Sequence, residues 1–166
     1  LFKDLLYGVL LPSGAEAAEA LAADYEGGRA AFIEEMNAAA RRLGMEDTHF
    51  TNVTGLHDPA HYTTVRDLVK LLAAALKNET FRAVFTAEEY RTSPTPEHPQ
   101  GIVLRSTLFQ KMESPDLPGG VILGGKTGYT EEAGLCLATL SRIKGEEYLL
   151  ITAGAPAQSS QQSFAV

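Results

Sequence analysis

A proline-rich segment, residues 92–101, divides this sequence into two parts with different patterns. It holds three of the eight prolines, and proline serves neither a helix interior nor a strand ladder, so we expect an exposed connection here. Apolar residues before the segment recur at the helical period, whereas those after it form short runs typical of strands. Helices followed by antiparallel strands predict an α+β fold.

The part before this segment contains five stretches with a helical pattern. The first ends at Pro12, and a second is expected to start at Ser13, because Ser13-Gly14-Ala15-Glu16 has the Ser-x-x-Glu form of a capping box. The segment from Thr48 to Tyr62 has no sustained period and is expected to be a structured loop. The apolar positions that mark the remaining helices are Phe32, Ile33, Met36, Ala40 and Leu43, ending at Gly44; Val65, Leu68, Val69, Leu72 and Leu76, capped by Thr63 or Thr64; and Phe81, Val84 and Phe85.

Four runs after the proline-rich segment are expected to be strands. They cover residues 102–108, 121–127, 135–143 and 148–153, and Lys144-Gly145 between the last two is a tight hairpin signal. The chain is therefore expected to hold one domain, with a helical lobe over residues 1–85 and a sheet portion over residues 86–166.

Charge and cysteine content exclude several classes of partner. The 166 residues carry a formal net charge of −7 and their basic residues are scattered, which argues against a nucleic-acid partner. No stretch approaches the ~20 apolar residues of a membrane-spanning helix. The single cysteine, Cys136, excludes an intrachain disulfide and a cysteine metal site, and we expect a small buried side chain in a strand.

The segment from Gly124 to Gly134 carries the residues with the clearest chemistry, Lys126-Thr127-Gly128, just before a predicted hairpin. On a strand, Lys126 supplies a positive charge and Thr127 a hydroxyl donor for a carboxylate, while Gly128 lets a peptide backbone approach. Such a strand can grip the C-terminus of a peptide. For the triplet alone, the alternative is an exposed polar hairpin entry with a glycine for bending.

The longer string Lys126-Thr127-Gly128-Tyr129-Thr130-x-x-Ala133-Gly134 resembles the third active-site motif of serine-type D-alanyl-D-alanine carboxypeptidases, which are low-molecular-mass penicillin-binding proteins. Further strings resemble the same family in the expected order, so the resemblance extends from Leu1 to about Pro156. It implies a penicillin-binding, β-lactamase-like fold of the α+β class, present here as one incomplete domain. Residues 163–166 then resemble the start of a truncated C-terminal helix of the family. These strings are Leu6-Tyr7-Gly8-Val9-Leu10-Leu11-Pro12-Ser13-Gly14, Met36-Asn37, Leu43-Gly44-Met45, Asp47-Thr48-His49-Phe50, Gly55-Leu56-His57-Asp58 and Tyr62-Thr63-Thr64-x-Arg66-Asp67-Leu68.

The resemblance implies an acylation mechanism, in which a serine attacks the bond between two D-alanines and a lysine one helical turn later activates it. Ser13 resembles the second-motif serine, which passes protons between that lysine and the leaving amine; the competing interpretation is that Ser13 only caps a helix. Lys126 and Thr127 would hold the terminal carboxylate, and the backbone amide of Tyr129 would form half of the oxyanion hole. Ala15 stands where the family has an Asn that orients the substrate amide, so we expect weaker substrate binding.

The family's first motif, Ser-x-x-Lys, is expected several tens of residues before Leu1, and the opening residues read as the middle of a protein. The only literal match is Ser141-Arg142-Ile143-Lys144. Positions three apart share a helix face, but this string ends a strand and enters a hairpin, where side chains point in different directions. As written, the chain is expected to lack the nucleophile and to be inactive.

Three histidines, His49, His57 and His61, lie close to Asp58 and raise the question of a metal site. His57 and His61 have the four-residue spacing of zinc-binding helices, but Pro59 between them argues against a helix. We expect hydrogen bonds that stabilise the loop instead, and the resemblance implies no metal or other cofactor.

The implied function is removal of the terminal D-alanine from peptidoglycan stem peptides, in an extracytoplasmic location. The implied partners are stem peptides ending in D-Ala-D-Ala and β-lactam antibiotics, and a membrane anchor is left open. Two alternatives remain: a non-catalytic cell-wall peptide-binding or β-lactam sensor module, favoured by Ala15, and a class A type β-lactamase, disfavoured by the carboxypeptidase pattern between Ser13 and Lys126. All of this depends on the strand from Lys126 to Tyr129 facing the turn that holds Ser13 across a cleft.

Overall fold

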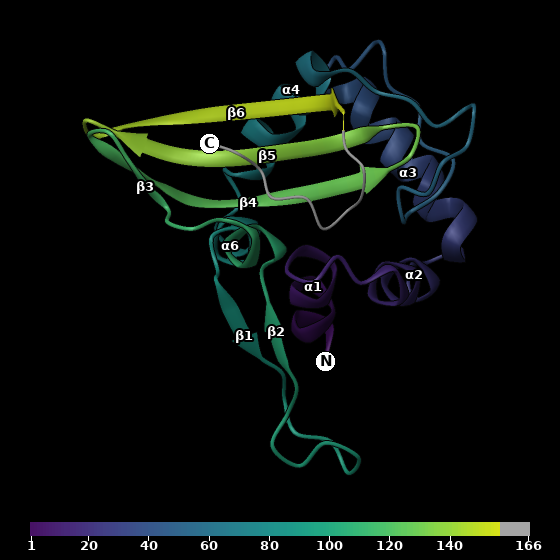
Figure 1. Cartoon of the computed structure of the whole chain (residues 1–166). Helices are drawn as coiled ribbons and strands as arrows, with labels where there is room; N and C mark the ends of the chain where they lie inside the picture. Colours follow the sequence, from purple (N-terminus) through teal and green to yellow (C-terminus); the bar gives the residue numbers. More distant parts are fainter. Residues whose placement is uncertain (157–166) are drawn as a thin grey trace.

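The computed structural model describes residues 1–156, which form a four-stranded antiparallel sheet, a set of helices at one end of it and behind it, and a small two-stranded hairpin that extends away (Figure 1). This arrangement confirms the predicted α+β class. The predicted helix start at residues 163–166 lies outside the described residues. The helices are α1 (Phe2–Leu10), α2 (Ala15–Ala23), α3 (Gly28–Arg42), α4 (Val65–Ala75), α5 (Glu79–Phe85) and α6 (Thr107–Lys111), and the strands are β1 (Glu89–Arg91), β2 (Val103–Arg105), β3 (Asp116–Leu117), β4 (Gly120–Thr130), β5 (Gly134–Ile143) and β6 (Glu146–Ala155).

The large sheet has the strand order β3-β4-β5-β6, and all of its pairings are antiparallel. The predicted hairpin at Lys144-Gly145 joins β5 to β6, and both residues have positive φ angles, 51° and 88°, as a tight two-residue turn requires. Strand β3 pairs only with Gly120 and Val121 at the start of β4. Among the described residues, no strand therefore pairs with the outer edge of β4 beyond residue 121.

Helix α4 covers one face of the sheet and forms a core with it. Leu72 of α4, Phe85 of α5 and Leu140 of β5 are buried there, and alternate residues of β6, Leu149 and Ile151, pack against them. The side chain of Thr64 caps α4 by accepting a hydrogen bond from the amide of Asp67, and Asn78 caps α5 in the same way. The apolar periods therefore predicted these helices correctly.

A second core joins α1 to α5 and to the hairpin of β1 and β2. Tyr7, Leu11 and Val84 are buried, and the ring of Tyr7 stacks on that of Tyr90 with centroids 3.7 Å apart. Leu11 lies at the end of α1 and is only 1% exposed. This packing fixes the turn that follows α1, which is where the predicted site begins.

The predicted capping box at Ser13 is wrong. Helix α2 begins at Ala15 with Gly14 as its N-cap residue, and no side chain caps its first amides. Ser13 instead has a φ of 62°, outside the extended region that an N-cap residue adopts, so its hydroxyl does not turn back toward the helix. The side chain is free to face the sheet.

The predicted strand over residues 102–108 is only partly correct. Strand β2 ends at Arg105, opposite Glu89, and the short helix α6 follows at once. The reason is tertiary: the amide of Thr107 bonds to the carbonyl of Leu11 at 3.0 Å and Leu108 is buried, so the chain turns toward α1. Strand β1 was missed, because its three residues alternate two charged side chains with Tyr90.

No helix within residues 1–156 combines the length and hydropathy that a membrane span requires.

Candidate active site

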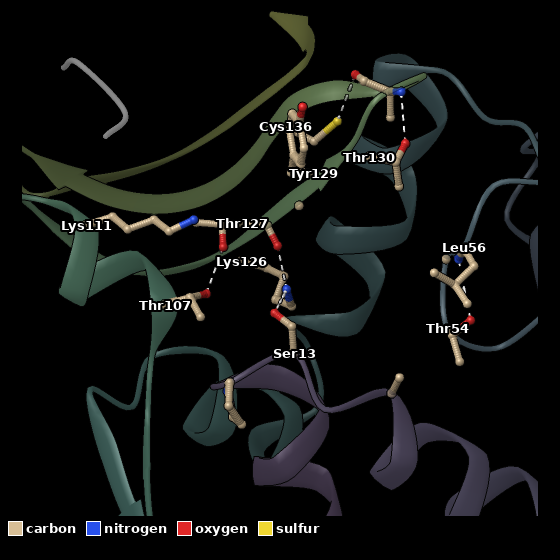
Figure 2. Close-up of a pocket in the computed structure, with 15 residues that line it drawn as sticks. Ser13, Thr54, Leu56, Thr107, Lys111, Lys126, Thr127, Tyr129, Thr130 and Cys136 are labelled. Carbon is tan, nitrogen blue, oxygen red and sulfur yellow. Dashed lines mark hydrogen bonds between the residues drawn. The ribbon is translucent and has the colours of Figure 1, made fainter. Parts of the chain in front are cut away.

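A cavity of about 490 Å³ opens between the turn after α1 and the outer edge of β4 (Figure 2). The strand and the turn on which the sequence interpretation depends therefore face each other. All the site residues named from the sequence line this cleft, namely Ser13, Ala15, Lys126, Thr127, Gly128 and Tyr129, and the other lining residues are Pro12, Thr54, Gly55, Leu56, Thr107, Lys111, Thr130, Ala133 and Cys136.

The turn that carries Ser13 is held by a close approach of two glycines. The amide of Gly14 donates a hydrogen bond to the carbonyl of Gly8 in α1 at 2.9 Å. A side-chain carbon added to Gly14 would lie 2.9 Å from that carbonyl oxygen, so any larger residue would push the turn away from α1. Pro12 ends α1 just before the turn. The exposed hydroxyl of Ser13 is thereby presented to the cleft.

Lys126 is the residue that connects the two walls. Its ammonium group donates hydrogen bonds to the Ser13 hydroxyl and to the carbonyl oxygen of Thr127 (Figure 2). Burial, and secondly the nearby charge of Lys111, lower the pKa of Lys126 from 10.5 to about 8. A hydroxyl that receives a bond from an ammonium group keeps its own proton for a further partner.

Thr127 has a partner that the sequence analysis missed. Its hydroxyl lies 2.7 Å from the hydroxyl of Thr107 in α6, and Thr127 is only 6% exposed. The amide of Thr107 also bonds to Leu11, so this one residue ties α6 to both walls of the cleft. A periodicity argument could not find Thr107, because its importance comes from contacts with residues far away in the sequence.

Gly128, Tyr129 and Ala15 complete the predicted set. Gly128 is exposed on β4, at a part of the strand whose outer edge has no strand partner among the described residues. Ala15, the first residue of α2, presents only a methyl group to the cleft. Tyr129 also lines the cleft, and the contribution of its backbone amide to an oxyanion hole stays a prediction.

The far wall of the cleft is a loop made rigid by one asparagine. The side-chain oxygen of Asn52 accepts hydrogen bonds from the amides of Thr54 and Gly55, and its amide group donates to the carbonyl of Leu56. The Leu56 side chain is 65% exposed at the cleft. The sequence analysis expected an ordered loop here but assigned these residues no place in the site.

The histidines stabilise this loop, as the sequence analysis expected for His49 and His61. The ring Nδ1 of His49 lies 2.7 Å from the carbonyl of Ala60, and the Nδ1 of His61 accepts from the amide of Thr51 at 3.1 Å. Burial is the main cause that lowers the pKa of His61. No group of three or more metal-ligating side chains occurs in the part of the chain that the structure describes.

The Ser141 to Lys144 string has the geometry that the sequence analysis expected. Ser141 lies buried near the end of β5, whereas Lys144 is exposed in the turn with a φ of 51°. Neither residue lines the cleft.

Cys136 is half-buried, so its predicted burial is only partly correct. It faces Gly128 across the β4–β5 pair, and a glycine offers no side chain to cover it.

Comparison with known proteins identifies the family. Residues 1–157 match the profile of the family described as D-alanyl-D-alanine carboxypeptidase. The chain belongs to this family. Among its carboxypeptidase relatives, a D-alanyl-D-alanine carboxypeptidase of Streptomyces is 35% identical over 95% of this chain and 57% of its own length. Another, from Mycobacterium tuberculosis, is 40% identical over 79% of this chain and 43% of its own length.

Solved structures show the same carboxypeptidase fold. The crystal structure of a Streptomyces DD-transpeptidase superposes with a TM-score of 0.79 at 34% identity, over 93% of this chain and 61% of that one. A D-alanyl-D-alanine carboxypeptidase structure from Mycobacterium tuberculosis gives a TM-score of 0.79 at 31% identity, over 95% of this chain and 57% of that one. The chain thus spans between two-fifths and two-thirds of the length of these four relatives. Both the family and the β-lactamase-like α+β fold named from the sequence are confirmed.

Proposed function

We propose that the cleft belongs to a serine-type D-Ala-D-Ala carboxypeptidase that removes the terminal D-alanine from peptidoglycan stem peptides. The observation that carries this proposal is the hydrogen bond from Lys126 to Ser13 across the cleft. It joins the third-motif strand to the second-motif turn, the two elements that hold a peptide terminus in the proposed reaction. Relatives that bear the name D-alanyl-D-alanine carboxypeptidase support the same reaction.

Binding of the substrate terminus follows from the properties of β4. A peptide that lies along the outer edge of β4, which has no strand partner beyond residue 121 within residues 1–156, gains backbone hydrogen bonds, and Gly128 leaves room for its approach. The terminal carboxylate would then meet the Lys126 ammonium and the Thr127 hydroxyl, both of which donate. The scissile carbonyl would point toward the amide of Tyr129.

The chemical step in this family uses the serine of a Ser-x-x-Lys motif, and no residue of the present chain is given that role. The serine gives its proton to the lysine of the motif and adds to the carbonyl between the two D-alanines. The C–N bond then breaks, and the leaving amine takes that proton from the lysine. Ser13 would pass that proton, because its hydroxyl accepts from one group while donating to another. Water then attacks the acyl-enzyme and releases the shortened peptide.

A different function is favoured by one observation, the methyl group of Ala15 in the cleft. In the family an Asn at this position orients the substrate amide, so its replacement suits a module that binds cell-wall peptides or β-lactams without turning them over. A β-lactamase is the third candidate. The carboxypeptidase pattern of the chain disfavours it.

Acylation by a labelled penicillin separates these three functions. The protein at its natural length, incubated with the label and analysed by intact mass spectrometry, should gain one long-lived adduct if it is a carboxypeptidase of this type. Absence of an adduct on the folded protein would contradict the enzyme and favour the binding module. Rapid hydrolysis of the penicillin would favour the β-lactamase.

The location and partners follow from the substrate. Peptidoglycan stem peptides lie outside the cytoplasm, so the proposed enzyme works there, with β-lactams as covalent inhibitors. Attachment of the enzyme to the outer face of the cytoplasmic membrane is compatible with this location. Protease accessibility on intact cells, compared with lysed cells, tests the location.

A further inference from the structure

The loop over residues 52–56, at the far wall of the cleft, has no part so far in the proposed reaction. Three of its residues, Thr54, Gly55 and Leu56, line the cleft, and Figure 2 shows Thr54 and Leu56 on a segment separate from β4. Leu56 is 65% exposed, although its side chain is large and apolar. A large apolar side chain at the wall of a cleft is suited to contact a ligand.

The course of β4 indicates which part of a peptide this loop would meet. In the proposed function the terminal carboxylate lies at Lys126 and Thr127, and the scissile carbonyl lies at the amide of Tyr129. A peptide followed away from its C-terminus therefore extends toward Thr130, the last residue of β4, which lines the same cleft as Leu56. We expect Leu56 to lie beside the residue that precedes the two D-alanines.

One side chain, that of Asn52, sets the course of the loop. Its Oδ1 atom accepts hydrogen bonds from the amides of Thr54 at 3.1 Å and Gly55 at 2.8 Å, and its amide group donates to the carbonyl oxygen of Leu56 at 2.9 Å. Asparagine does both because it carries an acceptor and two donors, whereas aspartate only accepts. The donated bond fixes the backbone of Leu56, and with it the direction in which the side chain leaves the loop.

Asn52 is itself held by the segment before it. Asn37 of α3 exchanges two hydrogen bonds with the backbone of Phe50, each 2.8 Å long. The amide of Thr51 donates to Nδ1 of His61 at 3.1 Å. The backbone up to Thr51 is therefore fixed from both sides, and Asn52 extends that support to the residues that face the cleft.

We propose that Asn52 is a positioning residue that acts through Leu56, and that the two give the site a preference for peptides with an aliphatic side chain just before the D-Ala-D-Ala pair. This inference rests on the proposed function and adds to it the chemistry of the upstream residue. Leu56 removes apolar surface of that side chain from water, and Asn52 keeps Leu56 where this contact is possible. A glycine at the same peptide position offers no side chain for the contact.

Two matched peptides measure this preference in the protein at its natural length, acetyl-L-norleucyl-D-Ala-D-Ala and acetyl-glycyl-D-Ala-D-Ala. The unmodified protein should favour the norleucyl peptide about tenfold in kcat/KM. Asn52→Asp keeps the accepted bonds but sets a carboxylate oxygen against the Leu56 carbonyl. The preference should then fall to about threefold or less, mainly through a higher KM for the norleucyl peptide. Leu56→Ala, at a largely exposed position, should fold normally and lose the preference to the same extent.

The double variant tests whether Asn52 acts through Leu56. In the Leu56→Ala background, Asn52→Asp should change the ratio of the two kcat/KM values by less than about 1.5-fold, because the side chain that it positions is already gone. Asn78→Asp makes the same isosteric change at the cap of α5, where aspartate caps equally well, and Asn78→Ala removes that cap. Neither control should alter the ratio, so added charge and lost stability are separated from positioning.

An unchanged ratio in Asn52→Asp, an equal loss for both peptides, or no preference in the unmodified protein would overturn the inference. If the unmodified protein hydrolyses neither peptide, the proposed carboxypeptidase function fails separately. Calorimetric binding of the two peptides then decides: Asn52→Asp should weaken only the norleucyl peptide, and equal weakening or none would contradict the role of Asn52. Amide hydrogen exchange of Thr54 and Gly55 in Asn52→Asp should match the unmodified protein. Faster exchange there would assign the loss to unfolding of the loop and count against positioning.

Discussion

The Lys126 ammonium group donates a hydrogen bond to the hydroxyl of Ser13, although 113 positions separate the two residues in the chain. One partner lies on β4 and the other in the turn between α1 and α2. Because the turn is fixed to α1 through Gly14 and the strand to β5, the bond spans two independently supported elements. The hydroxyl of Ser13 forms the bond across the cleft, whereas its backbone, with a positive φ, shapes the turn. Mutation can distinguish these two roles.

Replacement of Ser13 by glycine or by alanine separates these roles. Both changes remove the hydroxyl. In the protein at its natural length, to which all kinetic predictions below apply, we expect both to lower kcat/KM for a D-Ala-D-Ala peptide by about 100-fold or more, since the proposed proton carrier is lost. Only glycine adopts the positive φ of this position without strain. Ser13→Gly should therefore be about 0.5–1 kcal/mol more stable to urea unfolding than Ser13→Ala.

Glu16→Ala is the control for the rejected capping box. Because no side chain caps α2, this substitution should change the free energy of unfolding by less than about 0.5 kcal/mol. A loss near 1 kcal/mol, the usual value for an N-terminal cap, would show that the box forms after all.

The lowered pKa of Lys126 predicts a loss of activity at alkaline pH. In the proposed function the protonated form binds the substrate carboxylate, and this form disappears as the pH rises through about 8 instead of 10.5. The value of kcat/KM, which reports on the free enzyme, should therefore fall above about pH 8. Lys126→Arg keeps its charge at every pH tested, so its lower activity should show no such fall. The same fall in the Arg variant would assign it to another group.

The hydroxyl pair of Thr107 and Thr127 predicts a positioning effect. Thr107→Val preserves shape but leaves the buried Thr127 hydroxyl without this partner, which costs about 1–3 kcal/mol. We expect KM for a D-Ala-D-Ala peptide to rise several-fold, because the freed hydroxyl no longer points toward the carboxylate. Thr107→Ser retains the hydroxyl and should restore KM. A purely structural role would lower the melting temperature of Thr107→Val without changing KM at a temperature where it is folded.

Much of this fold could be predicted from local patterns. The cap at Thr64 and the turn at Lys144-Gly145 depend on residues close together in the chain, so their chemistry is visible in the sequence. Helix α6 could not be predicted in this way. It forms because Thr107 and Leu108 contact distant elements. From the local pattern alone, the strand over Val103-Leu104-Arg105 is equally well extended through these residues.

The candidate site shows the same division. Lys126, Thr127 and Gly128 were found because they are adjacent in one motif, and Ser13 because its surrounding string resembles the family. The capping-box interpretation of Ser13 failed because a sequence pattern does not reveal a positive φ. Thr107 and Lys111 carry no motif at all, and only the folded chain brings them to the cleft.

Two glycines of β4 should respond in opposite ways to alanine substitution. A side-chain carbon at Gly125 would lie 2.4 Å from the carbonyl oxygen of Ala138 and 2.8 Å from Leu108, so Gly125→Ala should destabilise the protein by about 1–3 kcal/mol and displace α6. At Gly128 the nearest atom, Cβ of Cys136, would be 3.6 Å away, so Gly128→Ala should change the free energy of unfolding little. Urea unfolding at constant pH measures both effects.

Substrate binding should be affected in the reverse order, with the larger effect in Gly128→Ala, when both variants are assayed in the folded state. The methyl group of Gly128→Ala would stand at the exposed strand edge where the peptide backbone is proposed to lie, and we expect KM to rise about tenfold while stability is kept. Gly125→Ala lies beneath α6, away from that edge, and should affect KM less than it affects the unfolding midpoint. If Gly128→Ala binds the peptide normally, the substrate does not pair with β4, and the binding geometry proposed for the carboxyl terminus is wrong.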